Sequence, residues 1–318
     1  MKALITGITG FAGSHLAEYL LDQNHEVFGA SRPRSPMENL TREVRQSVEL
    51  IECELRDSVA VKNTLHKVKP DWIFHLAAQS FVPTSWMSPG DTLNNNIMSQ
   101  LNIFEAMKDM KMDGTRVLIA GSSEEYGLVY ENEIPITENN PLRPLSPYAV
   151  SKVAQDLMGY QYFKSYGLQA IRSRAFNHTG PRRGEIFVTS TFAQQIAKIE
   201  KGIQPPSIKV GNLEAKRDFT DVRDTVRAYV SLMEKADAGD VYNISSGETV
   251  RIQDLLDKLL SFSNVEIKVE VDPNRLRPSD VPILLGDCSK LKEKVGWERK
   301  ISFDQTLKDL LDFWRERI

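Results

Sequence analysis

The stretch KALITGITGFAGSHLAEYLLD, residues 2–22, passes from an apolar β-type run through a glycine-rich turn into an amphipathic helix. Glycine lacks a Cβ, so the spacing of Gly7, Gly10 and Gly13 lets a phosphate approach the backbone. The helix N-terminus then offers free N–H groups and a positive dipole end. A tight turn without a ligand is the alternative, but the strand–turn–helix context favours dinucleotide binding. The residues predicted to line the pyrophosphate are Gly7, Gly10, Phe11, Ala12 and Gly13.

The same alternation of strand and helix continues along the chain. Further strands are predicted at 26–31, 48–53, 72–76, 116–120, 169–174 and 241–244, and helices at 58–68, 92–111, 148–166 and 187–201. The segment 32–47 is predicted to be an exposed loop or a short helix. Strands that alternate with helices of this length indicate βαβ units, a parallel sheet and right-handed crossovers.

After residue 176 the predicted segments become shorter, because prolines and a Gly-Asn pair interrupt the chain. We expect a smaller domain over the carboxyl ends of the strands, where open α/β sheets bind ligands. The predicted fold class is therefore α/β, a Rossmann-type doubly wound parallel sheet with a smaller C-terminal α/β substrate domain. Its predicted boundaries are 1–176 with a returning segment at about 218–247 for the first domain, and 177–217 with 248–318 for the second.

The composition is that of an ordinary globular protein, with 318 residues, 41% apolar and 26% charged side chains, and a net charge of −3. This net charge does not indicate binding to nucleic acid or to an anionic membrane. No apolar run approaches the ~18 residues of a membrane span. Cys53 and Cys288 stand apart from each other, and the histidines lack metal-ligand spacing, so neither a disulfide nor a metal site is predicted. We expect a cytoplasmic protein without a signal peptide.

The end of the second predicted strand indicates which dinucleotide is bound. An acidic residue is expected there if the 2′-hydroxyl of NAD is held, but the chain has Ser31 and Arg32, which suit a 2′-phosphate. The sequence therefore predicts NADP(H), with an exposed loop arginine as the alternative. Further predicted cofactor residues are Glu54 and Leu55 beside the adenine, and Leu76, Ala77 and Ala78 beside the ribose or nicotinamide. Asn96 is either a buried polar brace or a helix surface residue.

Tyr148 and Lys152 lie one helical turn apart, so both side chains face the same side of the helix. An unperturbed tyrosine has a pKa of about 10, and a nearby ammonium lowers the pKa of the phenol toward the working range. A solvated helix face is the alternative for this pair.

With these motifs in place, the chain resembles the extended short-chain dehydrogenase/reductase superfamily over essentially its whole length. The motifs that carry the resemblance are the glycine turn, Leu76-Ala77-Ala78, Ser122-Ser123-Glu124-Glu125-Tyr126-Gly127 and Tyr148-x3-Lys152. The resemblance implies that Ser122 and Tyr148 hold a sugar oxygen, and that Lys152 binds the nicotinamide ribose and lowers the pKa of Tyr148. It also implies a homodimer formed through a four-helix bundle of the segments at about 92–111 and 148–166.

The second half of the chain is most similar to the members of this superfamily that act on GDP-mannose derivatives. This resemblance implies a GDP-sugar substrate, with Arg217 and Arg277 as phosphate ligands and Asp280 as a ribose ligand; domain-bridging salt bridges are the alternative for both arginines. Further implied substrate residues are Ser123, Glu124, Asn177 and Val188.

Two reactions remain open within that branch. The favoured one is the NADPH-dependent reduction of a C4 ketone, which Ser122 and the strings Asn177–Pro181 and Arg217–Asp224 resemble. Against it, the string Arg182–Thr189 is similar to the nucleotide loop of the dehydratases. The alternative is a 4,6-dehydration, in which Glu124 removes the C5 proton; in a reductase Glu124 contacts sugar hydroxyls. For Glu125, beside it, the solvated half of a loop pair is an equally open interpretation. Another nucleotide-sugar epimerase or reductase, and a non-catalytic NADP(H) sensor, are the remaining hypotheses.

Overall fold

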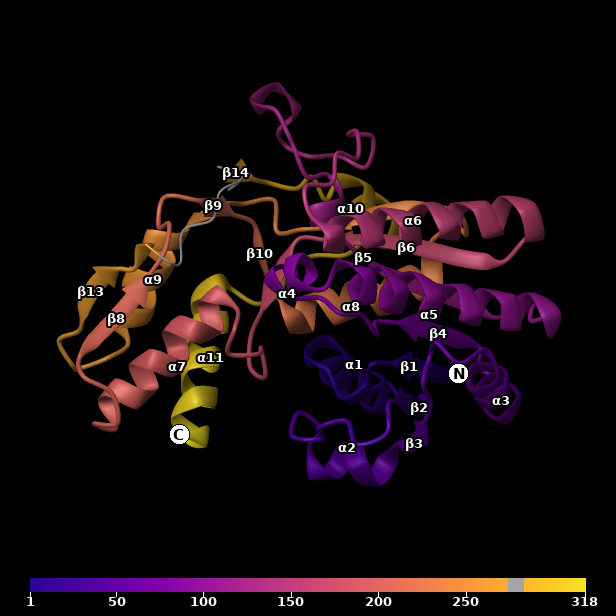
Figure 1. Ribbon diagram of the computed structural model, residues 1–318, viewed down its shortest axis with the longest axis horizontal. Coiled ribbons are helices and arrows are strands. Elements are labelled where there is room, and N and C mark those ends of the chain that lie inside the picture. The colour runs from indigo at the N-terminus through magenta and orange to yellow at the C-terminus, as the bar shows by residue number, and fades with distance from the viewer. Residues whose placement is uncertain (274–282) are drawn as a thin grey trace.

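The computed structural model describes residues 1–273 and 283–318, and a parallel sheet is the centre of this part of the chain (Figure 1). Its seven strands, counted within the described residues, stand in the order β11-β6-β5-β4-β1-β2-β3, and each neighbouring pair is parallel. The strands are β1 (Lys2–Thr6), β2 (Glu26–Ser31), β3 (Glu49–Glu52), β4 (Trp72–His75), β5 (Arg116–Ser122), β6 (Gln169–Ala175) and β11 (Val241–Ile244).

The strand order reverses at β1, which has β2 on one side and β4 on the other. A reversal of this kind leaves a crevice at the carboxyl ends of the strands, because the crossovers leave toward opposite faces. The Rossmann-type doubly wound sheet predicted from the sequence is confirmed, and β1, β2 and β11 have the predicted bounds. The other strands differ from their predicted limits by one or two residues.

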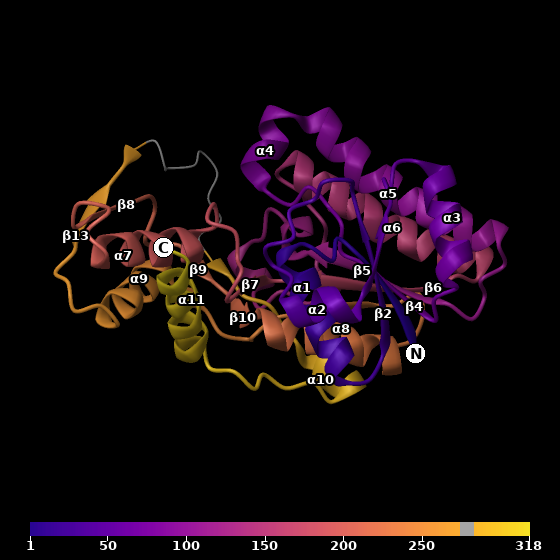
Figure 2. The same ribbon diagram turned by 90° about the horizontal axis from the view of Figure 1, so that it is seen from below.

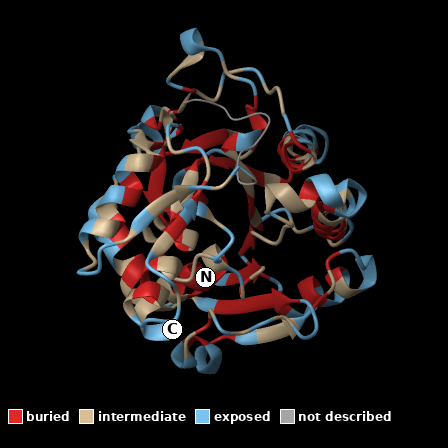
Figure 3. Ribbon diagram, turned by 60° about the vertical axis from the view of Figure 1, so that its left-hand side comes forward, coloured by how far each residue is buried: buried red, intermediate tan, exposed pale blue. Residues whose placement is uncertain are grey.

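Helices cover both faces of the sheet (Figure 2). On one face lie α3 (Ser58–Val68), α5 (Pro89–Asp109) and α6 (Pro147–Tyr166), and on the other α1 (Phe11–Asp22), α8 (Val222–Lys235) and α10 (Ser289–Val295). Each face has its own apolar core, and the central strands between them are largely buried, whereas the edge strand β3 is partly exposed (Figure 3). Short helices α2 (Arg42–Ser47) and α4 (Val82–Met87) lie in the connections, and α2 fulfils the loop-or-short-helix prediction for 32–47.

A second group of elements stands beside the sheet and has a separate apolar core. It contains the helices α7 (Val188–Glu200), α9 (Ile252–Ser261) and α11 (Phe303–Arg317). Its strands are β7 (Asn177–Thr179), β8 (Ser207–Val210), β9 (Lys216–Arg217), β10 (Phe219–Asp221), β12 (Val250–Arg251), β13 (Lys268–Val271) and β14 (Ile283–Leu284). The domain boundaries stay a prediction.

The second half of the chain is more regular than its prolines suggested. The sequence indicated short, irregular pieces there, whereas the described residues include α8, α9, α10 and α11. Pro205 and Pro206 fall between elements, before β8, and leave the helices uninterrupted. They end segments without reducing helix content, because proline is excluded from helix interiors but tolerated between elements.

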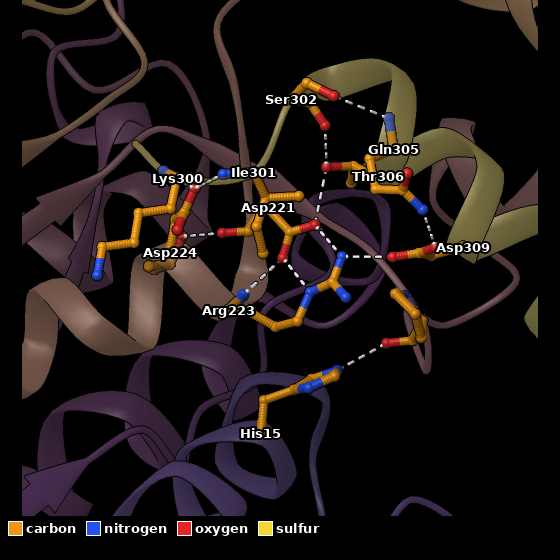
Figure 4. Close-up of polar contacts among 12 residues, drawn as sticks. His15, Asp221, Arg223, Asp224, Lys300, Ile301, Ser302, Gln305, Thr306 and Asp309 are labelled. Atoms are coloured by element: carbon orange, nitrogen blue, oxygen red, sulfur yellow. Dashed lines mark hydrogen bonds and ion pairs between the residues drawn. The ribbon is translucent and has the colours of Figure 1, made fainter. Parts of the chain in front are cut away.

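A buried carboxylate joins this second group to the sheet (Figure 4). Asp221 caps the N-terminus of α8 by accepting a hydrogen bond from the Arg223 N–H at 2.8 Å, and its Oδ2 accepts another from the Thr306 hydroxyl of α11 at 2.8 Å. The Arg223 guanidinium binds Asp221 and also Asp309 of α11, at 2.8 and 2.7 Å. One fully buried side chain therefore fixes α11 against α8.

Asp224, one turn further along α8, performs a similar task. Its Oδ2 accepts hydrogen bonds from the backbone N–H groups of Lys300 and Ile301, both at 3.0 Å, and it also pairs with Arg227. Asp221 and Asp224 belong to the string Arg217–Asp224, which in the sequence resembles the reductases. In the structure, its acidic residues at 221 and 224 hold neighbouring segments together.

We expect Asp221→Ala to lower the free energy of unfolding by about 1–3 kcal/mol, because α8 loses its N-cap acceptor and the Thr306 hydroxyl loses its buried partner. Asp309→Ala is the matched control: its carboxylate binds the same arginine but is partly exposed, so we expect a loss below about 1 kcal/mol. Urea denaturation followed by circular dichroism measures both. Equal losses for the two variants would contradict the role given to Asp221.

Candidate functional site

The glycine turn between β1 and α1 has a conformation that requires glycine. Gly7 has a φ of +73°, and a Cβ there would lie 3.0 Å from the backbone of Ala77. A Cβ on Gly13 would lie 2.3 Å from the Gly7 carbonyl oxygen, and Gly10 closes the turn by donating its N–H to that same oxygen at 2.9 Å. The turn therefore packs against the end of β4 with no space for side chains at Gly7 and Gly13.

The N-terminus of α1 faces the crevice at the carboxyl end of β1. The first helical hydrogen bond runs from the Ser14 N–H to the Gly10 carbonyl, so the N–H groups of Phe11, Ala12 and Gly13 precede it. The sequence of the first turn contains no acidic residue. This combination of N–H groups and helix dipole suits a pyrophosphate, so the predicted residues fit the dinucleotide.

The ends of β2 and β3 meet beside this turn, since the two strands are neighbours. Ser31 is buried as the last residue of β2, and Arg32 is exposed directly after it. Glu54 has a lowered pKa, chiefly because Arg56 donates a hydrogen bond to it, with a contribution from the charge of Arg32. Leu55 is buried below these charged groups. The predicted adenine and 2′-phosphate residues thus gather at one rim.

Beyond the end of β4, Leu76, Ala77 and Ala78 are partly exposed. The Ala77 N–H donates to the Thr6 hydroxyl at 3.2 Å, which joins the ends of β4 and β1.

Asn96, on α5, is fully buried, so the structure decides between its two predicted roles in favour of the polar brace. Its side chain bonds both the N–H and the carbonyl of Gln79, at 2.8 and 3.1 Å. It also donates to Ser151 at 2.9 Å, and the Ser151 hydroxyl donates to the Tyr148 carbonyl. Asn96 therefore links the segment after β4 to the turn of α6 that carries Tyr148.

The three predicted catalytic side chains meet where α6 crosses the end of β5. The Ser122 side chain is near enough to the Tyr148 phenol to lower its pKa, and the Ser122 hydroxyl accepts the Glu124 N–H at 3.2 Å. Lys152 is buried, donates to the Ala120 carbonyl at 2.8 Å, and lies 5.9 Å from the centre of the Tyr148 ring. Of the two alternatives for Tyr148 and Lys152, the buried site is therefore right and the solvated helix face is wrong.

The pKa values in this site are governed mainly by burial. Burial raises the pKa of Tyr148, and the nearby Ser122 side chain and the charge of Arg183 oppose this only in part. The sequence predicted a lowered pKa for the phenol, and the structure gives the opposite net direction because desolvation disfavours the phenolate. Burial also lowers the pKa of Lys152 to about 8, an effect that Glu125 partly reverses.

Glu124 and Glu125 differ sharply in burial. Both lie on the 3-10 turn η1 (Ser123–Glu125) after β5, but Glu124 is exposed and Glu125 is fully buried. The interpretation of Glu125 as the solvated half of a loop pair was wrong, because its side chain turns inward to accept the Ser122 N–H at 2.8 Å. The charge of Glu124 raises the pKa of Tyr148, which places this carboxylate at the catalytic pocket.

The residues predicted to bind substrate are more scattered. Ser123 is buried at the start of η1. Asn177 donates to the Asp218 carbonyl at 3.3 Å, Val188 is exposed at the first position of α7, and Arg217 lies on β9 between β12 and β14. The predicted Arg277 and Asp280 lie outside the described residues.

Arg183 belongs to the string Arg182–Thr189, which in the sequence is similar to the nucleotide loop of the dehydratases but gave this arginine no catalytic role. Its guanidinium lies over the ring of Phe187 at 3.4 Å and faces the ring of Phe11 at 5.0 Å. The ring of Phe11 also stacks on His178 at 5.8 Å. The positive charge of Arg183 acts to lower the pKa of Tyr148. Arg183 therefore connects the loop after β7 with the catalytic residues. The neighbouring Arg182 lies in a different contact, since its guanidinium donates to Glu18 of α1 at 2.6 Å.

The chain, with its dinucleotide turn and its Ser–Tyr–Lys site, is similar to known proteins over nearly its whole length. Residues 4–310 match the family model of GDP-mannose 4,6 dehydratase. The chain belongs to this family. Among curated relatives, it is 33% identical to the GDP-6-deoxy-D-mannose reductase of Pseudomonas aeruginosa, covering 100% of this chain and 98% of the relative. It is 35% identical to GDP-mannose 4,6 dehydratase 1 of Arabidopsis thaliana, covering 98% of this chain and 88% of the relative.

A solved structure agrees with these similarities in sequence. The structure of RMD from Pseudomonas aeruginosa complexed with NADPH superposes with a TM-score of 0.86 and 30% identity, covering 100% of this chain and 99% of that one. Within the described ranges, no helix has the length and apolar character needed to cross a membrane. The same residues contain no cluster of three or more His, Cys, Asp or Glu arranged to hold a metal.

We expect Gly121→Ala to destabilise the protein by about 1–3 kcal/mol or more, because a Cβ at the end of β5 would lie 2.2 Å from the Ser173 carbonyl oxygen. Gly90→Ala, in α5, has nothing within 4 Å of the added Cβ and should be neutral or stabilising by about 0.5–1 kcal/mol. Chemical denaturation of both variants checks this. A Gly121→Ala protein as stable as the Gly90→Ala protein would show that the catalytic turn is not packed as described.

Proposed function

We propose that this protein reduces the C4 keto group of GDP-4-keto-6-deoxy-D-mannose with NADPH, forming GDP-6-deoxy-mannose (GDP-D-rhamnose). The observation that carries the proposal is the gathering of Ser122, the buried Tyr148 and the buried Lys152 where α6 meets the end of β5. The match over 98% of the length of a GDP-6-deoxy-D-mannose reductase supports this choice.

The side chains of the site divide the work of carbonyl reduction. Bound NADPH supplies the hydride. Tyr148 donates its proton to the C4 oxygen, and its raised pKa keeps the phenol protonated until then. Ser122 holds the same oxygen through its hydroxyl, and the Lys152 cation stabilises the phenolate that remains.

The cofactor is held by the carboxyl ends of the central strands. The N–H groups of Phe11, Ala12 and Gly13 bind the pyrophosphate, and Ser31 and Arg32 bind the 2′-phosphate. The adenine is bordered by Glu54 and Leu55. The ribose and nicotinamide are bordered by Leu76, Ala77 and Ala78, and the nicotinamide ribose is also bound by Lys152.

The GDP-sugar lies between the sheet and the second group of elements in this proposal. Ser123, Glu124 and Asn177 contact the sugar end, and Val188 presents the N-terminus of α7 to the nucleotide. Arg217 grips the phosphates, and Arg277 and Asp280, outside the described residues, complete the predicted set.

A second candidate function is GDP-mannose 4,6-dehydration with tightly bound NADP. It is favoured by the position of Glu124, whose exposed carboxylate acts on Tyr148 from the mouth of the pocket. In that reaction Tyr148 takes the C4 hydroxyl proton and Glu124 removes the C5 proton.

We also propose a cytoplasmic homodimer formed through α5 and α6. The two helices pack side by side, and their outer faces expose Met98, Leu157 and Tyr160 at 36–53% of their surface. Exposed large apolar groups on neighbouring helices suit a four-helix interface.

Two incubations test the proposed reaction. With GDP-4-keto-6-deoxy-D-mannose and stoichiometric NADPH, we expect loss of NADPH absorbance and one reduced sugar per NADPH. With GDP-mannose and catalytic NADP⁺, we expect no keto sugar to accumulate, and the reverse pattern would select the dehydratase.

Tyr148→Phe should lower kcat by about 10²–10⁴-fold while NADPH still binds, because only the proton transfer is lost. Unchanged turnover in that variant would remove Tyr148 from the mechanism.

Arg32→Ala should weaken NADPH binding about 10–100-fold, since a charge-assisted bond to the 2′-phosphate contributes about 1.5–3 kcal/mol, and should leave NADH binding unchanged. Arg42→Ala removes an exposed arginine from α2 and serves as the control, with no selective effect on NADPH expected. Fluorescence titration measures the affinities of wild type and of both variants for NADPH and for NADH. Equal weakening of NADPH and NADH would argue against recognition of the 2′-phosphate by Arg32.

A further inference from the structure

Glu125 is a fully buried carboxylate directly beneath the catalytic serine. Its Oε1 accepts the Ser122 N–H at 2.8 Å, so it fixes the backbone of the residue that presents its hydroxyl to Tyr148. A Cβ on Gly121 would lie 2.5 Å from this same oxygen. The end of β5 is therefore shaped to admit the Glu125 carboxylate.

The second oxygen of Glu125 is incompletely bonded. Its Oε2 lies 3.2 Å from the Nε of Arg174, but that N–H donates to Asp156 at 2.9 Å. The Nη1 of Arg174 donates to the Tyr126 hydroxyl at 3.1 Å and to the Glu138 carbonyl at 3.2 Å. As a result, Oε2 has no hydrogen-bond partner among the described residues. A carboxylate in this position depends on its charge partners.

The charges around Glu125 come from several elements. Asp156 of α6 is bonded by both Arg174 and Arg172 of β6, the latter at 2.6 Å, so it takes up much of the positive charge of β6. Lys152, one turn before Asp156 on α6, is the cation on the catalytic side of Glu125. The titratable and charged groups that face this cluster are Glu124, Tyr126, Glu138, Tyr148, Lys152, Asp156, Arg172 and Arg174.

Burial and the charge of Asp156 raise the pKa of Glu125 to about 8, against the charges of Arg174 and Lys152 and the Ser122 N–H. The pKa of Lys152 is also about 8, lowered by burial and raised by Glu125. The two groups therefore titrate in the same range, and each changes the proton affinity of the other.

We propose that Glu125 is a positioning residue for the carbonyl reduction: it orients Ser122 through the backbone and sets the charge state of Lys152 and Tyr148 by its own ionisation. This inference rests on the proposed function. Ionised Glu125 raises the pKa values of both Lys152 and Tyr148. Its removal therefore moves the loss of either proton to lower pH.

The isosteric variant Glu125→Gln tests this assignment, since its amide oxygen still accepts the Ser122 N–H while the charge is gone. The control is Glu131→Gln, which removes the same charge from an exposed turn. We expect the basic limb of the pH profile of kcat/KM to move down by about one unit in Glu125→Gln, the size of a typical charge effect. This shift gives about 10-fold lower kcat/KM above the limb and a much smaller change at pH 6. The Glu131→Gln profile should match wild type. A uniform loss of kcat/KM in Glu125→Gln with an unmoved limb would overturn the proposal.

A readout without turnover separates this inference from the proposed function. Because the folded-state pKa of Glu125 is raised, the native protein holds a proton that the unfolded chain releases from about pH 4.5 upward. Its contribution to stability is complete below that pH and is lost as the pH rises to about 8. In thermal melts, the Tm of Glu125→Gln should therefore fall less between pH 5.5 and pH 8 than the Tm of wild type or of Glu131→Gln. Identical pH dependence in all three proteins would overturn the charge coupling. Melts as expected, with no reduction of any keto sugar by wild type, would instead overturn the proposed function and with it the catalytic part of this inference.

Discussion

The hydrogen bond from Lys152 to the Ala120 carbonyl is the contact on which the rest of the site depends. It holds an ammonium at the buried junction of α6 and β5, where desolvation lowers its pKa to about 8. A cation in such a place needs nearby negative charge or accepting oxygens. The end of β5 supplies both, through the carbonyl itself and through Glu125. The same junction places Tyr148 over Ser122, so the position of the helix determines the chemistry.

Features with a local cause were predictable from the sequence. The glycine turn is needed because Gly7 has a positive φ and Gly13 touches the Gly7 carbonyl, and both constraints arise within a few residues. Tyr148 and Lys152 share a face because four residues are about one helical turn. The strands of the sheet were found because buried parallel strands form continuous apolar runs.

Features that depend on distant contacts were not predictable. Nothing in the pair Glu124-Glu125 indicates which carboxylate turns inward, because Arg174 and Asp156 lie 31 or more residues further along the chain. The string Arg182–Thr189 was noted for its resemblance to a nucleotide loop, but the position of Arg183 beside Phe11 was not predictable, since this contact joins the second group of elements to the first helix. The string Arg217–Asp224 carried a resemblance to the reductases, and within it Asp221 and Asp224 hold α8 and its neighbours together.

The central claim is that this site delivers hydrogen to sugar C4, and the most direct test follows that atom. NADPH carrying deuterium at the transferable position of nicotinamide C4 is incubated with GDP-4-keto-6-deoxy-D-mannose, and the product is examined by NMR. The account predicts one deuterium at sugar C4 for each NADPH consumed, from one of the two stereoisomers of the labelled cofactor. A sugar without deuterium at C4, with the labelled cofactor unconsumed, would contradict it.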